Sequence, residues 1–226
     1  MQHALEADHI AAVASLGTRA TSLREGIRLG SIWGLGHTLT LFVFGTVVLV
    51  MNSVVPERLA LGLEFAVGVM LVFMGGAVLR EIIKRKVHVH SHRHLNGGVH
   101  IHLHSHENDP IDHALNPHRH NHPPGFPLRS LFVGMMHGMA GSAALILLTL
   151  QQVDSLPLSL LYIFLFGLGS TLGMALLSIV IVIPLRFSKR SWSPVYEGGQ
   201  LVIGLATFAL GVVIMVQTGV KGGLLI

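Results

Sequence analysis

Residues 29 to 51 read LGSIWGLGHTLTLFVFGTVVLVM, and this run decides the fold class. A helix that crosses the hydrocarbon core of a bilayer needs about 20 mostly apolar residues. This stretch supplies them, with His37 as its single ionisable group, and similar runs recur at residues 59–82, 128–151, 157–184 and 199–218. The mean hydropathy of +0.64 and the 12% share of charged residues are outside the usual range of soluble domains. We therefore expect an all-α membrane protein.

Residues 1–17 form a partial sixth span. The segment is helical in pattern but short, and its first part holds His3, Glu6, Asp8 and His9. It lacks the basic start and the apolar centre of a signal peptide. Either the chain begins inside what should be a longer helix, or this helix is a half-span that ends within the bilayer. Counting it gives about six transmembrane helices.

The basic residues are distributed unevenly between the two sides of this topology. All 15 lysines and arginines except Arg58 and Lys221 fall in connections on one side. Because cytoplasmic connections carry an excess of Lys and Arg, we predict that this side faces the cytoplasm of a bacterial-type inner membrane, with both termini outside. The basic residues do not form the continuous patch of a nucleic-acid-binding protein, so no nucleic-acid partner is expected.

The two halves of the chain match at three successive places. MQHAL at residues 1–5 resembles MMHGM at 135–139, and GLGHTL at 34–39 resembles GLGSTL at 167–172. The third match aligns Glu64, Gly68 and Gly75 with Gln200, Gly204 and Gly211. A unit of three spans repeated once crosses the membrane in opposite senses. We therefore predict two inverted three-helix repeats, residues 1–86 and 128–226, joined by a connection at 87–127, an architecture typical of secondary transporters.

Ionisable side chains from three predicted helices reach a similar depth in the membrane. Asp8, His9, His37 and His137 lie about 12–15 Å along their helices from the nearest cytoplasmic arginine. Such groups are costly inside hydrocarbon and therefore indicate function. Imidazole and carboxylate ligands suit nickel, cobalt or zinc, and the chain has no cysteine for a thiolate site. The candidate metal ligands are His3, Asp8, His9, His37 and His137.

The spacing of the first ligands limits their geometry. At about 100° per residue, a straight helix cannot direct His3, Asp8 and His9 to one ion. Either the helix is broken, as in many transporters, or Asp8 orients a histidine through a hydrogen bond. A third alternative is a square-planar nitrogen set from the free amine, the amides and the imidazole of Met1-Gln2-His3. The helical pattern favours the first two.

The motifs around these ligands resemble a known family. HALEADHI at residues 3–10 is similar to the HX4DH signature of the nickel/cobalt transporter (NiCoT) superfamily, which matches His3, Asp8 and His9. Leu35-Gly36-His37-Thr38 resembles the family's second motif, and the resemblance covers essentially all of the membrane region. Long members have eight spans, so six spans are more similar to the shorter branch of urease-associated transmembrane proteins and nickel/cobalt efflux proteins.

This resemblance implies a carrier that moves Ni²⁺ or Co²⁺ as its substrate, requires no cofactor, and is not an enzyme. Zn²⁺ is a further candidate substrate, and metallochaperones or urease and hydrogenase maturation proteins are candidate partners. The direction stays open, with a slight preference for efflux or homeostasis. The alternatives are a zinc or other divalent-cation carrier and an intramembrane metal-dependent hydrolase, although the HExxH motif of many metal hydrolases is absent.

The cytoplasmic connection contains most of the histidines. Residues 87–106 read VHVHSHRHLNGGVHIHLHSH, and strict alternation around Asn96-Gly97-Gly98 predicts a β-hairpin. Histidines opposite one another on neighbouring strands are close enough to share a metal ion. We expect an auxiliary site that buffers, senses or funnels metal, with the following histidines: His88, His90, His92, His94, His100, His102, His104 and His106.

Several other polar residues are candidates for the ion path or a gate. They share a predicted position within or beside the spans, and they are Glu6, Glu64, Thr38, Ser142, Ser170 and Thr171. The alternative for the hydroxyls is structural, because Ser and Thr in membrane helices usually hydrogen-bond to their own backbone. Glu64 could equally be an interfacial carboxylate.

Overall fold

The computed structural model describes residues 2–20, 22–51, 55–86, 88–93, 99–104, 127–139, 155–191 and 193–224. Four long helices dominate these residues: α2 (Leu23–Val50), α3 (Glu57–Lys86), α6 (Leu156–Ser191) and α7 (Ser193–Val216). A π-helical turn, η3 (Gln217–Lys221), continues α7. All four are long and apolar enough to cross a membrane. The expected all-helical membrane architecture therefore holds for four of the predicted spans.

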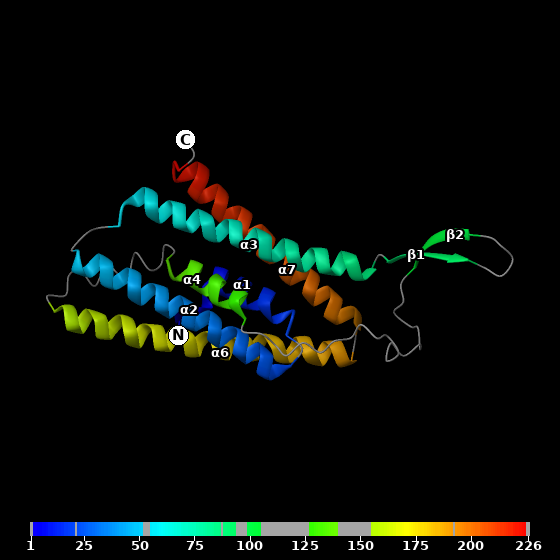
Figure 1. Ribbon diagram of the computed structural model, residues 1–226, viewed down its shortest axis with the longest axis horizontal. Helices are drawn as coiled ribbons and strands as arrows, with labels where there is room; N and C mark the ends of the chain where they lie inside the picture. The colour runs from blue at the N-terminus through cyan, green and yellow to red at the C-terminus, as the bar shows by residue number, and fades with distance from the viewer. Residues whose placement is uncertain are drawn as a thin grey trace.

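Two short helices lie inside the bundle. Figure 1 shows α2 beside α6 and α3 beside α7, with α1 (Ala7–Gly17) and α4 (Leu128–Gly138) between these two pairs. The predicted span at residues 128–151 begins as α4, and its continuation lies outside the described residues. The count of six spans and the division of the chain at residues 86 and 128 remain predictions.

Local sequence explains where α2 begins. Ser22 has an extended backbone, and its hydroxyl accepts a hydrogen bond from the backbone N–H of Glu25 at 3.0 Å. This is the first half of a capping box, in which a side chain satisfies one of the free N–H groups of the first turn. The cap fixes the start of α2 on the side where the basic residues gather.

Glycines bring the central helices into backbone contact. A methyl group added at Gly34 of α2 would lie 2.7 Å from Cα of Thr171 in α6, and one added at Gly30 would lie 2.9 Å from the carbonyl oxygen of Met174. In the same way, a methyl group at Gly134 of α4 would clash with the backbone carbonyl of Trp33. Small residues at helix contacts are typical of membrane proteins, where close packing replaces the hydrophobic effect.

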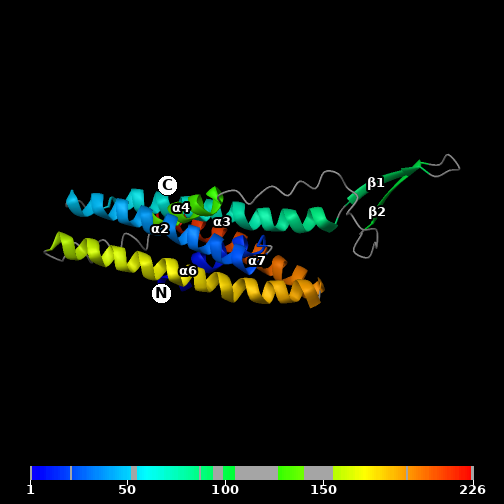
Figure 2. The ribbon, with the colours of Figure 1, turned by 60° about the horizontal axis from the view of Figure 1, so that its bottom comes forward.

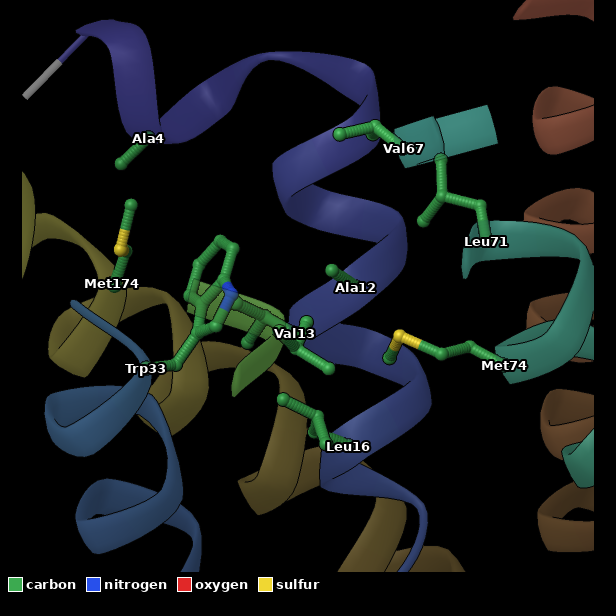
Figure 3. Close-up of a cluster of buried hydrophobic side chains, with 10 residues drawn as sticks. Ala4, Ala12, Val13, Leu16, Trp33, Val67, Leu71, Met74 and Met174 are labelled. Carbon is green, nitrogen blue, oxygen red and sulfur yellow. The ribbon is translucent and has the colours of Figure 1, made fainter. Parts of the chain in front are cut away.

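The core gathers around α1. Figure 3 shows Val13 of α1 between Trp33 of α2 and Met74 of α3, and all three side chains are buried. The outward faces of the long helices are apolar instead of polar; Phe73 and Phe187, for example, are exposed by 71% and 73%. Apolar side chains on the outside and close helix packing on the inside are what a lipid environment requires.

The described part of the histidine-rich connection contains two antiparallel strands, β1 (His88–Arg93) and β2 (Val99–His104). The register pairs His88 with His104, His90 with His102, and His92 with His100. Figure 2 shows these strands beyond the C-terminal end of α3. His94, His106 and the expected turn at residues 96–98 lie outside the described residues, and the side of the membrane and any metal binding remain predictions.

Candidate metal site

The N-terminal ligand segment is broken at Glu6. Residues Gln2–Leu5 form a short 3₁₀ helix, η1, and Glu6 then takes an extended conformation with φ −63° and ψ 147° before α1 begins. The break turns His3 back toward His9, so that their ring centroids lie 4.4 Å apart. Of the alternatives that the spacing allowed, the segment has the broken form, and Asp8 also bonds a histidine.

Four histidines from three segments meet in the interior. His3 and His9 come from the N-terminal segment, His37 from α2 and His137 from α4. The ring centroids of His3 and His37 lie 5.2 Å apart, those of His9 and His37 5.4 Å, and those of His9 and His137 5.1 Å. All four side chains are buried. His9 lies at the centre of this group, which we call the histidine cluster.

The histidine cluster and Asp8 form two sets of three candidate ligands. His3, His9 and His37 make one set, and Asp8, His9 and His137 make the other, with the ligand atoms of each set within 4.8 Å of one another. We call them the upper triad and the lower triad. All five residues expected from the sequence as metal ligands are therefore neighbours, and His9 belongs to both sets.

Each histidine of the cluster keeps a ring nitrogen available. The Nδ1 atom of His3 lies 2.7 Å from Oε1 of Glu6, that of His9 lies 2.9 Å from Oδ1 of Asp8, and that of His137 lies 3.2 Å from the carbonyl oxygen of Val133. With Nδ1–H donating to these acceptors, the lone pair at Nε2 is free for an ion.

Four other ring nitrogens of the cluster are buried without a hydrogen-bond partner among the described residues. They are Nε2 of His9, Nε2 of His137, and both ring nitrogens of His37. A buried polar atom without a partner costs about 1–3 kcal/mol. Several such atoms at one place are unfavourable for packing alone, and a cation bound at one set of these histidines would satisfy a lone pair of each ring that it contacts.

Aromatic side chains enclose the histidine cluster. The Trp33 ring centroid lies 5.4 Å from that of His9 and 5.3 Å from that of His137, and Phe166 of α6 lies 5.2 Å from His3. Sequence analysis missed both residues. Trp33 precedes His37 by one helical turn, so helical spacing from the ligand was the signal that could have found it.

The candidate path residues differ in their surroundings. The Thr38 hydroxyl donates to the carbonyl oxygen of Gly167 at 2.8 Å and lies 3.0 Å from the Thr171 hydroxyl, which ties α2 to α6. Ser170 is buried, and its hydroxyl has no partner in the described parts of the chain. Glu64 is half-buried in α3 and belongs to neither triad. Ser142 lies outside the described residues.

Comparison with known proteins gives one clear relative. The chain is 34% identical over 225 residues to the urease accessory protein UreH of Bacillus sp. (strain TB-90), which covers 99% of this chain and 90% of the relative. That name describes an accessory protein and not a catalytic subunit, in agreement with the expectation that the chain is not an enzyme. No protein-family model and no solved structure matches the chain.

Proposed function

The chain belongs to the family of the urease accessory protein UreH, and from that membership we propose that it carries Ni²⁺ across a membrane. The observation that carries the proposal is the buried histidine cluster. Four imidazoles and one carboxylate from three segments approach one another between helices long enough to span a bilayer. Imidazole nitrogen is a preferred ligand of nickel, cobalt and zinc, so Co²⁺ and Zn²⁺ are further substrates to be tested.

Contacts between α3 and α7 support the inverted repeat. A methyl group added at Gly68 would lie 2.9 Å from the carbonyl oxygen of Gly211, and one added at Gly75 would lie 2.7 Å from that of Gly204. In the alignment of the two halves, Gly68 corresponds to Gly204 and Gly75 to Gly211. Exchanging the halves therefore turns one contact into the other, as a two-fold axis between the repeats would do.

Contacts between α2 and α6 are also converted into one another when the two halves are exchanged. Gly34 lies against Thr171, and Gly167 lies against Thr38. The alignment matches Gly34 with Gly167 and Thr38 with Thr171, so these two contacts are again partners. Exchanging the halves turns the hydrogen bond between the hydroxyls of Thr38 and Thr171 into itself. This is expected of a contact that lies on the proposed two-fold axis.

The halves differ where the ligands lie. His37 of the first repeat corresponds to Ser170 of the second, so one half supplies an imidazole and the other a hydroxyl. An asymmetric site between symmetric halves is suited to alternating access, in which one scaffold rocks about a fixed ion. We propose that the ion is held by the upper triad or the lower triad, with His9 common to both, while the repeats move against one another.

The proposed topology keeps the basic connections and the histidine-rich strands on the cytoplasmic side of a bacterial inner membrane. A carrier there would deliver nickel to urease maturation proteins or remove its excess. Metal-dependent growth of cells that lack or overproduce the chain tests the direction. If cells without the chain grow more poorly at limiting nickel, the chain takes nickel up. If the same cells are more sensitive to excess nickel, the chain exports it.

Vesicles that contain the purified protein test the carrier function directly. We expect radioactive nickel to move across the membrane with the native chain, and both His9→Ala and His37→Ala to abolish movement, because each removes a buried ligand. His102→Ala in β2 is the matched control and should leave transport intact. Repeating the assay with cobalt and zinc ranks the substrates. Undiminished transport by both cluster variants, or tight binding without movement in the native chain, would contradict the proposal.

A further inference from the structure

A pocket outside the metal site lies on the basic side of the helices. Its cavity volume is about 680 Å³, and it lies between α3, the start of α4, the residue Arg19 just after α1, and Phe208 of α7. None of the candidate metal ligands lines it. We call it the basic pocket.

The basic pocket has a charged end and an apolar end. Its α3 wall runs from Val72 and Phe73 through Gly76 and Ala77 to Arg80, Glu81 and Lys84. At about 1.5 Å per residue, the distance from Phe73 to Lys84 is roughly 16 Å along the helix axis. The cationic end thus lies at the basic end of α3, where the membrane surface is expected, and the phenylalanine end lies deeper, among apolar side chains.

Positive charge dominates the charged end. Four cationic residues line the pocket, Arg19, Arg80, Lys84 and Arg129, against one carboxylate, Glu81. Arg19 lies 3.8 Å from Glu81, and the guanidinium groups of Arg19 and Arg129 repel each other electrostatically. A bound anion would neutralise this excess of positive charge.

The apolar end is open to a long hydrocarbon group. Phe73 is exposed by 71% and Phe208 by 39%, although both line the pocket. A methyl group added at Gly76 would meet no atom within 4 Å. An inorganic anion or an acidic peptide would neutralise the arginines and leave this apolar length unused, whereas a lipid would use both ends.

We propose that the basic pocket binds one anionic phospholipid of the adjoining leaflet, with its phosphate at Arg19, Arg129, Arg80 and Lys84, and an acyl chain along Phe73 and Phe208. Basic pockets between membrane helices are suited to lipid head groups of this kind. The ligand joins the ends of α1 and α4 to α3. Because α1 and α4 both carry ligands of the histidine cluster, the lipid also holds these two helices in place.

Binding is measured on the full-length protein in a neutral detergent, by native mass spectrometry and by thermal unfolding. We expect phosphatidylglycerol to remain bound and to raise the unfolding temperature, and phosphatidylcholine to do neither. The double variant Arg19→Gln/Arg129→Gln should weaken phosphatidylglycerol binding by more than tenfold, since one basic residue near a lipid surface contributes about fivefold. The matched control is Arg24→Gln/Arg186→Gln, two arginines that do not line the pocket, and it should bind as the native chain does.

A second variant separates a lipid from other anions. Gly76→Leu narrows the apolar end and leaves every cation of the pocket in place, and its Cβ would meet no atom within 4 Å. We expect it to lose phosphatidylglycerol binding while its unfolding temperature without lipid stays unchanged. Native affinity in Gly76→Leu, equal binding of phosphatidylcholine, or an equal stabilisation by inorganic phosphate would overturn the proposal. Neither lipid binding nor the unfolding temperature is measured with nickel, so both test the lipid proposal whatever the transport assay gives.

Discussion

Within the histidine cluster, short hydrogen bonds decide which ring nitrogen stays available to a metal ion. Glu6 and Asp8 accept from Nδ1 of His3 and His9, and a backbone carbonyl does the same for His137. Each bond selects the tautomer whose Nε2 lone pair is free. The carboxylates also fix the orientation of the rings they contact. The orientation of these candidate ligands therefore depends on residues one to four positions away in the sequence.

Asp8→Asn tests this dependence. The variant removes the carboxylate charge beside Nδ1 of His9 and one ligand of the lower triad, and we expect nickel affinity to fall by about 10–100-fold, the usual cost of losing such a partner. Isothermal titration of the purified protein measures it. Glu64→Gln, a carboxylate change outside both triads, should leave the affinity unchanged. Equal affinities for Asp8→Asn and the native chain would show that the hydrogen bond does not tune the ligand.

Sequence alone predicted which polar residues gather at the candidate site, but not the aromatic side chains around them. His3, Asp8, His9, His37 and His137 could be found because ionisable residues are rare in apolar runs, and their depth could be counted along each helix. Trp33 and Phe166 could not be found in this way. An aromatic residue in an apolar run is ordinary, and only the packing of α2 and α6 around His3 and His9 brings these rings to the cluster.

At the scale of single helices, the apolar runs predicted α2, α3, α6 and α7, since length and hydropathy suffice for a span. The break at Glu6 was one of two alternatives, because spacing excluded a straight helix without choosing between them. The sequence did not predict which helices pack against one another. Glycine positions indicate close contacts, but the same glycines fit several arrangements, and only the folded chain pairs Gly34 with Thr171.

Gly34→Ala tests the contact of α2 with α6. Its new methyl group would lie 2.7 Å from Cα of Thr171, so the helices must separate, and we expect a loss of about 1–3 kcal/mol in the free energy of unfolding. Gly169→Ala is the matched control, because its methyl group meets nothing within 4 Å. It should be neutral or slightly stabilising, as alanine is the better helix former. Denaturation in detergent measures both, and equal stabilities would mean that α2 and α6 do not depend on this contact.

For the whole molecule, the described strands of the histidine-rich connection lie beyond the C-terminal end of α3 (Figure 2). β1 and β2 pair with each other, with histidine opposite histidine at three positions of the register, and no residue of these strands belongs to either triad. Paired strands that share no residue with the triads fit an auxiliary role better than a place on the ion path.

Deleting residues 87–122 tests that role. We expect transport in vesicles to survive, because the histidine cluster is intact, and the dependence of the rate on nickel concentration to change, because the auxiliary ligands are gone. Replacing the same segment with a Gly/Ser linker of equal length controls for the tether between α3 and α4. Complete loss of transport in both forms would assign the hairpin to the path itself.

A single imidazole, that of His9, belongs to both triads, and this limits how many ions the interior can bind at one time. An ion that binds His9 in the upper triad deprives the lower triad of a fully independent ligand. Equilibrium dialysis of the chain without residues 87–122 should therefore saturate at one equivalent of nickel per molecule. Two equivalents would mean either that His9 bridges two ions as an imidazolate or that Asp8 and His137 hold the second ion without it. With one equivalent bound, the interior holds a single ion and admits the next only after the previous one has left.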